Sequence, residues 1–138
     1  MQSSDNSTHS LPNLSNSMGE VLGIEFISVE EGLVKATMPV DNRTCQPYGF
    51  LNGGASLALA EMVAGHGSVP LCGEQEMPCG IQVSASHVGM VRTGTHVIAT
   101  GRLIHRGRTT HLWNVDITTP EGKLVSTARI VNQIVKKH

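Results

Sequence analysis

One segment limits the folds open to this chain: residues 53–69, between Asn52 and Pro70, which form a pattern typical of one long helix. No proline interrupts the segment, and its leucine, alanine, methionine and valine residues leave hardly any polar face. Such a helix has to be covered on nearly every side by other parts of the protein. Either a curved surface from the same chain wraps around it, or a second chain covers the remainder.

The segments on both sides of this helix predict strands. Residues 23–40 alternate in period two around a turn at Glu31-Gly32, which indicates a hairpin. Residues 80–88, 95–105, 109–119 and 124–135 repeat the pattern, the last two around a turn at Pro120-Glu121-Gly122. The order of hairpin, helix and four strands predicts an α+β fold with an antiparallel sheet over the helix. A homodimer that continued the sheet would also cover an edge strand.

The N-terminal region divides into two parts. Residues 1–10 are polar and rich in serine and asparagine, so we expect a disordered tail. Residues 11–138 are then a single domain, because the length allows one core but not two. Leu11 to Met18 predicts a short helix, and residues 41–52 a loop with turn-forming residues.

Composition excludes several classes of function. Ten lysines and arginines balance eleven acids, and aromatic residues make up 3%, so neither nucleic acid nor an anionic membrane is an expected partner. No segment has the length and hydrophobicity of a membrane span or a signal peptide, so we expect a cytoplasmic protein. The three cysteines and seven histidines lack the spacing of metal or redox sites, and we expect no metal.

Glu61 is the one acid of the long helix. Its neighbours three and four positions away are Leu57, Ala58, Ala64 and Gly65, which predicts that the carboxylate lies off any solvated stripe. Removing a carboxylate from water is costly and usually indicates a partner or a function. An ion pair with another element is the structural alternative to a catalytic acid.

The start of the same helix favours the catalytic interpretation. Gly53 and Gly54 offer backbone N–H groups at the positive end of the helix dipole, where they can polarise a carbonyl. Glu61 lies eight residues further on, about 12 Å along a helix, so one chain can hardly place both groups on one carbonyl. Two antiparallel helices in a dimer would bring Glu61 of one copy to Gly53 of the other.

Two further features allow more than one interpretation. His105, Arg106 and Arg108 surround Gly107 between two strands, which suits phosphate binding but is equally typical of a solvated hairpin turn. His87 follows the alternation of its strand, so it is either a hydrogen-bonded structural histidine or a ligand contact.

The stretch MPVDNRTCQPYGFLNGGASLALAE resembles the hotdog-fold acyl-CoA thioesterases of the PaaI type. The similarity is greatest to the bacterial aroyl-CoA hydrolases of menaquinone and enterobactin pathways, including 1,4-dihydroxy-2-naphthoyl-CoA hydrolases, and runs from Val21 to the C-terminus. The resemblance implies a curved antiparallel sheet wrapped around one long central helix. It also implies a dimer, or a dimer of dimers, with the active site at the dimer interface.

The resemblance assigns roles to individual residues. Glu61 matches the catalytic acid, acting as nucleophile or general base, and the Gly53 amide matches the oxyanion donor. Gln46 matches a polar residue that contacts the attacking water or the substrate. Asn52 stands where the closest relatives have histidine, and we expect it to act in catalysis through a hydrogen bond from its side-chain amide. Gly65 stands where several relatives have serine or threonine. Substrate and coenzyme A contacts are implied for Gly80, His87, Val88, Gly89, Met90, His105, Arg106, Gly107, Arg108, Thr109 and Thr110.

These observations predict an enzyme that hydrolyses acyl-CoA thioesters with an aromatic or medium-chain acyl group. Coenzyme A is then part of the substrate, and no cofactor is expected. Two alternatives stay open. A hotdog dehydratase of hydroxyacyl thioesters would need an acid and a histidine together, and a non-catalytic acyl-CoA binder would result if Asn52 and Gly65 have dismantled the site.

Overall fold

The computed structural model of the chain describes residues 10–138, so the predicted disordered tail lies almost entirely outside the described residues. The elements follow one another along the chain in the order α1 (Met18–Leu22), β1 (Glu25–Glu30), β2 (Leu33–Val40), α2 (Gly53–Ser68), the short 3-10 helix η2 (Val69–Leu71), β3 (Glu76–His87), β4 (Thr95–Arg106), β5 (Thr110–Thr118) and β6 (Leu124–Lys136).

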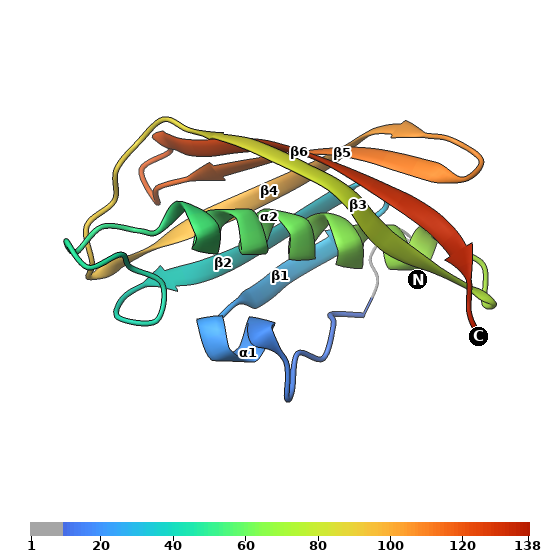
Figure 1. The fold of residues 1–138 in the computed structure, drawn as a ribbon, viewed down its shortest axis with the longest axis horizontal. Coiled ribbons are helices and arrows are strands. Elements are labelled where there is room, and N and C mark those ends of the chain that lie inside the picture. The colour runs from blue at the N-terminus through green and yellow to red at the C-terminus, as the bar shows by residue number, and fades with distance from the viewer. Residues whose placement is uncertain (1–9) are drawn as a thin grey trace, which may run out of the picture.

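The strands form one six-stranded sheet in the order β1-β2-β4-β5-β6-β3, and every neighbouring pair is antiparallel. Helix α2 runs lengthwise along one face of this sheet, and α1 lies beside β1 at one edge (Figure 1). The arrangement confirms the predicted α+β fold and the predicted order of hairpin, helix and four strands. Strands β1 and β3 are the two edges, and β3 is the longer of them, with 12 residues against 6.

The core lies between α2 and the sheet. Leu59, Ala60, Val63 and Ala64 of the helix are fully buried against the inner face of the strands. Trp113 of β5, the single tryptophan of the chain, is buried beneath the helix together with inner-face residues of β2, β4 and β6. Burial of these side chains is the main source of stability, at about 1.5–3 kcal/mol for each large aliphatic residue.

Two glycines allow α2 to approach the sheet closely. A Cβ atom on Gly67 would lie 2.6 Å from Trp113 and 2.8 Å from Val34, and one on Gly101 would lie 2.6 Å from Val63. These distances are shorter than carbon atoms normally tolerate, so the packing requires the absence of both side chains.

The side of α2 that faces away from the sheet is incompletely covered. Gly54 and Glu61 are exposed there, and Leu57, Ala58 and Met62 are half-buried. Helix α1 covers part of this side, where a Cβ on Gly19 would lie 3.4 Å from Met62 Sδ. The sheet of one chain therefore leaves part of this apolar helix open to solvent.

The short N-terminal helix was predicted too early in the chain. The sequence predicted residues 11–18, whereas the helix spans Met18–Leu22. Before it, the Ser15 N–H donates to Asn13 Oδ1 and Ser17 Oγ donates to the Leu14 carbonyl. These bonds from polar side chains replace helical backbone bonds, which is why the spacing of Leu11, Leu14 and Met18 does not produce a helix.

The other boundaries agree closely with the sequence. Gly32 and Gly122 adopt the positive φ angles of the two predicted turns, 77° and 94°. Strand β3 begins at Glu76, four residues before the predicted start, because it continues its pairing with the end of β6. No helix within residues 10–138 is long and apolar enough to cross a membrane.

Candidate active site

Within the described residues, the start of α2 presents one unpaired backbone donor, the Gly53 N–H. Asn52 is the N-cap, and its Oδ1 accepts a hydrogen bond of 2.8 Å from the Gly54 N–H. Gly53 is the first helical residue, where an α-helix offers no carbonyl partner for the N–H group. The capping bond fixes the helix start and leaves the Gly53 amide at its positive end. The sequence placed Asn52 among the catalytic residues, as a side-chain amide donor, and did not predict this capping role.

His87, at the end of β3, lies against Gly53. A Cβ atom on Gly53 would be 2.8 Å from both Cδ2 and Nε2 of the imidazole, so only glycine allows this approach. His87 Nδ1 makes a 2.7 Å hydrogen bond with the hydroxyl of Ser126, a buried residue of β6. The ring is thus held in place with its Nε2 edge against the first residue of the helix.

Glu61 lies over the middle of the same strand, against Gly80. A Cβ atom on Gly80 would be 2.6 Å from Glu61 Oε2. The expectation that this carboxylate lies off the solvated side is wrong for a single chain, because Glu61 is exposed. The reason is that its neighbours Leu57, Ala58 and Gly65 lie on the side of α2 that the sheet of the same chain leaves uncovered.

The structure keeps the two predicted catalytic groups apart. Gly53 and Glu61 are eight residues apart on one helix, which corresponds to about 12 Å. Each is paired with its own position on β3: Gly53 with His87, and Glu61 with Gly80. One chain therefore holds the two predicted catalytic groups at separate places, against positions seven residues apart along an edge strand.

Gln46 is engaged by its own loop. Its side-chain Oε1 accepts a short hydrogen bond from the Tyr48 N–H, and its backbone N–H donates to the Phe50 carbonyl. The loop pairs further through the isolated bridges Cys45–Leu51 and Phe50–Arg92. In one chain, these bonds hold Gln46 within the turn that precedes α2.

The loop after β3 lies beside the start of β6. The Val88 and Gly89 N–H groups both donate to the Val125 carbonyl, at 2.8 and 3.0 Å. A Cβ on Gly89 would lie 2.7 Å from the Leu124 carbonyl oxygen, so this position also requires glycine. The side chains of Val88 and Met90 are more than half exposed next to His87, as an apolar ligand surface would require.

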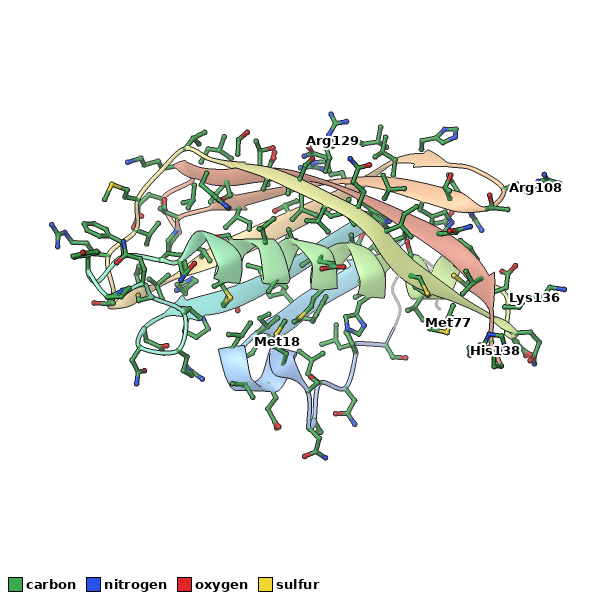
Figure 2. The ribbon with its side chains drawn as sticks, in the orientation of Figure 1. Met18, Met77, Arg108, Arg129, Lys136 and His138 are labelled. Carbon is green, nitrogen blue, oxygen red and sulfur yellow. The ribbon has the colours of Figure 1, made fainter. Side chains whose placement is uncertain are left out.

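The predicted basic turn, residues 105–110, connects β4 to β5 at the other end of α2. The Gly107 N–H donates to the Thr110 carbonyl, and Arg106 Nη2 donates to the carbonyl of Leu71, which follows α2. Arg108 projects from the tip of this hairpin, at the end of the sheet where Met77 and Lys136 also lie (Figure 2). Within one chain the turn is therefore remote from Gly53.

A buried polar cluster beneath the C-terminal half of α2 was missed by sequence reasoning. The hydroxyl of Ser68 accepts hydrogen bonds from Trp113 Nε1 (2.8 Å) and Asn132 Nδ2 (3.1 Å) and lies 2.8 Å from His111 Nδ1. Because both lone pairs of Ser68 are occupied, its hydrogen points to His111, which places the proton of that ring on Nε2. Burial and the nearby Arg106 lower the pKa of His111 below its ordinary value, in agreement with a neutral ring.

One signal in the sequence could have revealed this cluster. Asn132 stands in phase with Ala128 and Ile130 on the inner face of β6, so a polar residue occupies a position of the apolar pattern. A polar side chain at a core position is unusual and indicates a specific role, whereas a single exposed apolar residue is common and indicates none. Within residues 10–138, no group of three His, Cys, Asp or Glu side chains could hold a metal ion.

Comparisons with known proteins agree on one family. Residues 48–126 match the family described as Thioesterase superfamily. The 1,4-dihydroxy-2-naphthoyl-CoA hydrolase of Escherichia coli (strain K12) is 38% identical over 128 residues, covering 87% of this chain and 91% of that protein. The structure of a Pseudomonas aeruginosa thioesterase has a TM-score of 0.87 and 35% identity, covering 95% of this chain and 99% of that chain.

A thioesterase of Staphylococcus aureus gives a TM-score of 0.82 at 34% identity and covers 85% of this chain and 97% of that one. Its solved mutants carry alanine in place of a glutamine and of a glutamate that lie fifteen positions apart. Gln46 and Glu61 are separated by the same fifteen positions in this chain.

Proposed function

This chain belongs to the thioesterase superfamily and has its hotdog fold, and from that premise we propose that it hydrolyses acyl-CoA thioesters with an aromatic or medium-chain acyl group. One observation carries the proposal. The free amide of Gly53 at the helix start lies against His87, and the Glu61 carboxylate lies against Gly80, with both contacts on the same edge strand, β3. The first group suits a developing oxyanion, and the second suits a base for water.

The reaction follows from these two groups. The thioester carbonyl lies at the Gly53 N–H, which stabilises the negative charge that develops on its oxygen. Glu61 takes a proton from a water molecule while the water oxygen forms a bond to the carbonyl carbon. The carbon–sulfur bond then breaks, and the proton passes from Glu61 to the coenzyme A thiolate. The products are the free acid and coenzyme A, and no further reactant is needed.

The two halves of the site meet when two chains pair through β3. In an antiparallel pairing centred between Val83 and Ser84, Gly80 of one subunit lies beside His87 of the other. Glu61, which covers Gly80, then comes next to Gly53, which His87 contacts. The pairing also covers the exposed side of α2 and removes the β3 edge. We therefore place the active site at the interface of a homodimer.

The same pairing explains the position of the basic turn. Because the two α2 helices are antiparallel in this dimer, the β4–β5 hairpin of one subunit lies toward the Gly53 end of the other. Arg106 and Arg108 then approach the site from the partner subunit, where their guanidinium groups suit the phosphates of coenzyme A. Val88 and Met90 of the first subunit supply apolar surface next to His87. The similarity to a naphthoyl-CoA hydrolase supports a CoA thioester with an aromatic acyl group.

The first test is turnover of a panel of acyl-CoAs, followed by a thiol reagent. Benzoyl-CoA and medium-chain acyl-CoAs should release free thiol, and Glu61→Gln should reduce kcat by roughly 10²-fold or more, because the amide cannot accept the proton. Full activity in Glu61→Gln would remove Glu61 from the mechanism. Binding without thiol release would identify an acyl-CoA binder, and dehydration of a hydroxyacyl-CoA would identify a dehydratase.

The second test asks whether one site uses two chains. Glu61→Gln and Gly53→Pro each inactivate every site of their own homodimer. After unfolding and refolding together, a mixed dimer contains one intact site, formed by Gly53 of the first variant and Glu61 of the second. Activity should return to about a quarter of the wild-type value, since half of the dimers are mixed and each has one working site of two. A mixture that stays inactive would show that each site lies within one chain.

A further inference from the structure

One buried side-chain oxygen has no hydrogen-bond partner among residues 10–138: Oδ1 of Asn132. The side chain lies on the inner face of β6 and is 1% exposed. Leaving a buried acceptor unpaired costs about 1–3 kcal/mol, and native structures pair nearly all such groups. The atom therefore calls for a donor that the resting protein does not supply.

The orientation of the Asn132 amide follows from its other bonds. Its Nδ2 donates to the Ala64 carbonyl of α2 and to Ser68 Oγ, both at 3.1 Å. A carbonyl oxygen only accepts, so the NH₂ group has to face Ala64. The oxygen of the amide then faces the opposite way, across the sheet toward β3.

The group on that side is the carboxylate of Glu61. Gly80 is the register partner of Asn132 on β3. The position that a Cβ would occupy on Gly80 lies 3.6 Å from Asn132 Oδ1 and 2.6 Å from Glu61 Oε2. Two acceptor oxygens thus face one small space that exists because residue 80 has no side chain. Two such oxygens attract each other only when a hydrogen lies between them.

We propose that Asn132 is a positioning residue for Glu61, with its Oδ1 accepting a hydrogen bond from the Glu61 carboxyl after that group has taken a proton from water. This inference rests on the proposed thioesterase function and deepens it. Asn132 stabilises the carboxyl form of Glu61 and orients it, and it does not touch the substrate. It thereby favours general-base catalysis over direct attack by the carboxylate, because only a base passes through the protonated state.

The charged and titratable groups around this contact are few. On α2, His66 packs edge-on against Phe26 of β1, and burial lowers its pKa. On β5, His111 is separated from Asn132 by Ser68. Strand β3 carries Cys79, His87 and, at its start, Glu76, whose Oε1 accepts from the Gly73 N–H. Arg129 of β6 points away from α2 (Figure 2), where it donates to Asn114. The ion pair found in residues 10–138 joins Arg43 to Asp41, which leaves Glu61 without a cationic partner in its own chain.

The test is the pH profile of kcat for the intact dimer with a benzoyl-CoA substrate. Replacing Asn132 by leucine removes the acceptor while keeping a similar volume, and alanine is a second variant in case leucine does not fold. Without the acceptor the carboxylate form is favoured, so the acid limb of the profile should move to lower pH by about 0.7 unit, the equivalent of one hydrogen bond. The plateau of kcat should fall by about two- to fivefold, because Glu61 is a weaker base by the same 0.7 unit, while KM stays unchanged.

Ser68→Ala is the matched control. It disrupts the same buried cluster, since Trp113 Nε1 and Asn132 Nδ2 lose a shared acceptor, but it leaves Oδ1 facing Glu61. The melting temperature of this variant should fall while its acid limb stays at the wild-type pH. A limb that moves equally in Ser68→Ala and Asn132→Leu would show a general structural effect and overturn the proposal.

A second readout separates this inference from the proposed function. Carbon-13 NMR of the Glu61 carboxyl, recorded across pH without substrate, should show protonation at lower pH in Asn132→Leu than in the wild type. If thioesters are hydrolysed through Glu61 but this midpoint and the acid limb do not move, the positioning role is wrong and the function stands. If no thioester is hydrolysed, the function fails, and the NMR titration still decides whether Asn132 contacts the Glu61 carboxyl.

Discussion

Glycine brings α2 close to the sheet in two regions, and the two regions differ in what fills the space. Beneath the C-terminal half of the helix, Gly67 and Gly101 make room for Trp113, Val34 and Val63, which are packed apolar side chains. Along β3, Gly53 makes room for the His87 ring and Gly80 for the end of the Glu61 side chain.

The difference teaches that one steric requirement can serve stability or chemistry. In the apolar region, which we call the packed region, the atoms that a new Cβ would meet are locked by neighbours on all sides. We call the region along β3 the strand-edge region. There, the atoms that a new Cβ would meet belong to polar side chains with solvent on one side, as both His87 and Glu61 are exposed. Added methyl groups should therefore reduce stability in the packed region and activity in the strand-edge region.

The largest expected effect is at Gly53. Proline is well tolerated at the first position of a helix, and the extended backbone of Asn52 (φ −76°, ψ 132°) suits a following proline. Gly53→Pro removes the N–H donor and also adds carbon atoms near His87, whereas Gly53→Ala adds a carbon and keeps the donor. We expect kcat of the proline variant to be about 10²–10³-fold below that of the alanine variant. Equal rates would exclude the amide as the oxyanion donor.

Gly80→Ala tests the part of the strand-edge region that lies next to Glu61. The new Cβ would displace Glu61 Oε2, the far end of a flexible side chain, rather than a packed group. A shift of about 1 Å in a catalytic group costs roughly 10²-fold in rate, so kcat should fall by that factor while the melting temperature changes little. A large loss of stability instead would mean that Gly80 belongs with the packed region.

Gly67→Ala should show the opposite pattern. Alanine gains up to about 1 kcal/mol in helix propensity, but contact with Trp113 and Val34 at less than 3 Å should cost about 1–3 kcal/mol. Urea unfolding should therefore show a net loss of stability, with kcat per folded molecule unchanged. Gly65→Ala is the control on the same helix, because its Cβ would meet no atom of its own chain within 4 Å and should not destabilise.

The smallest expected effect is a pH dependence of stability that arises in the packed region. Burial lowers the pKa of His111 and His66, so on acidification the unfolded chain takes up protons below about pH 6.5 before the folded chain does. The unfolded state then binds more protons, and stability should fall as pH decreases from 7 to 5. His111→Gln keeps a polar side chain but does not titrate, so its urea midpoint should change less over this range. An unchanged slope would contradict the assignment of His111 as a neutral buried residue.

The sequence predicts the fold well because the signals involved are local. Alternation defined the strands, and an uninterrupted apolar segment defined α2 to within a residue. The short helix was misplaced because Asn13, Ser15 and Ser17 bond to nearby backbone groups, a competition that apolar spacing does not report.

The candidate site was predictable only in part, for a physical reason. Glu61 and Gly53 stand out by residue type and helix position, which one sequence segment reveals. The contacts of Gly80 with Glu61 and of Gly53 with His87 join residues nineteen and thirty-four positions apart, and they depend on the register of β3 against the helix. Asn132 is further still from Glu61 in sequence, so its unpaired oxygen becomes visible only once β6 has been placed beside β3.

The position of Trp113 gives this protein an optical probe of its own. As the only tryptophan, it has no exposed surface and donates to Ser68 beneath α2, so its fluorescence arises from the packed region alone. Its emission should shift to longer wavelength on unfolding, when the indole enters water. Changes confined to the strand-edge region should leave the spectrum as it is, so one measurement on a purified variant distinguishes a damaged core from a damaged site before any substrate is added.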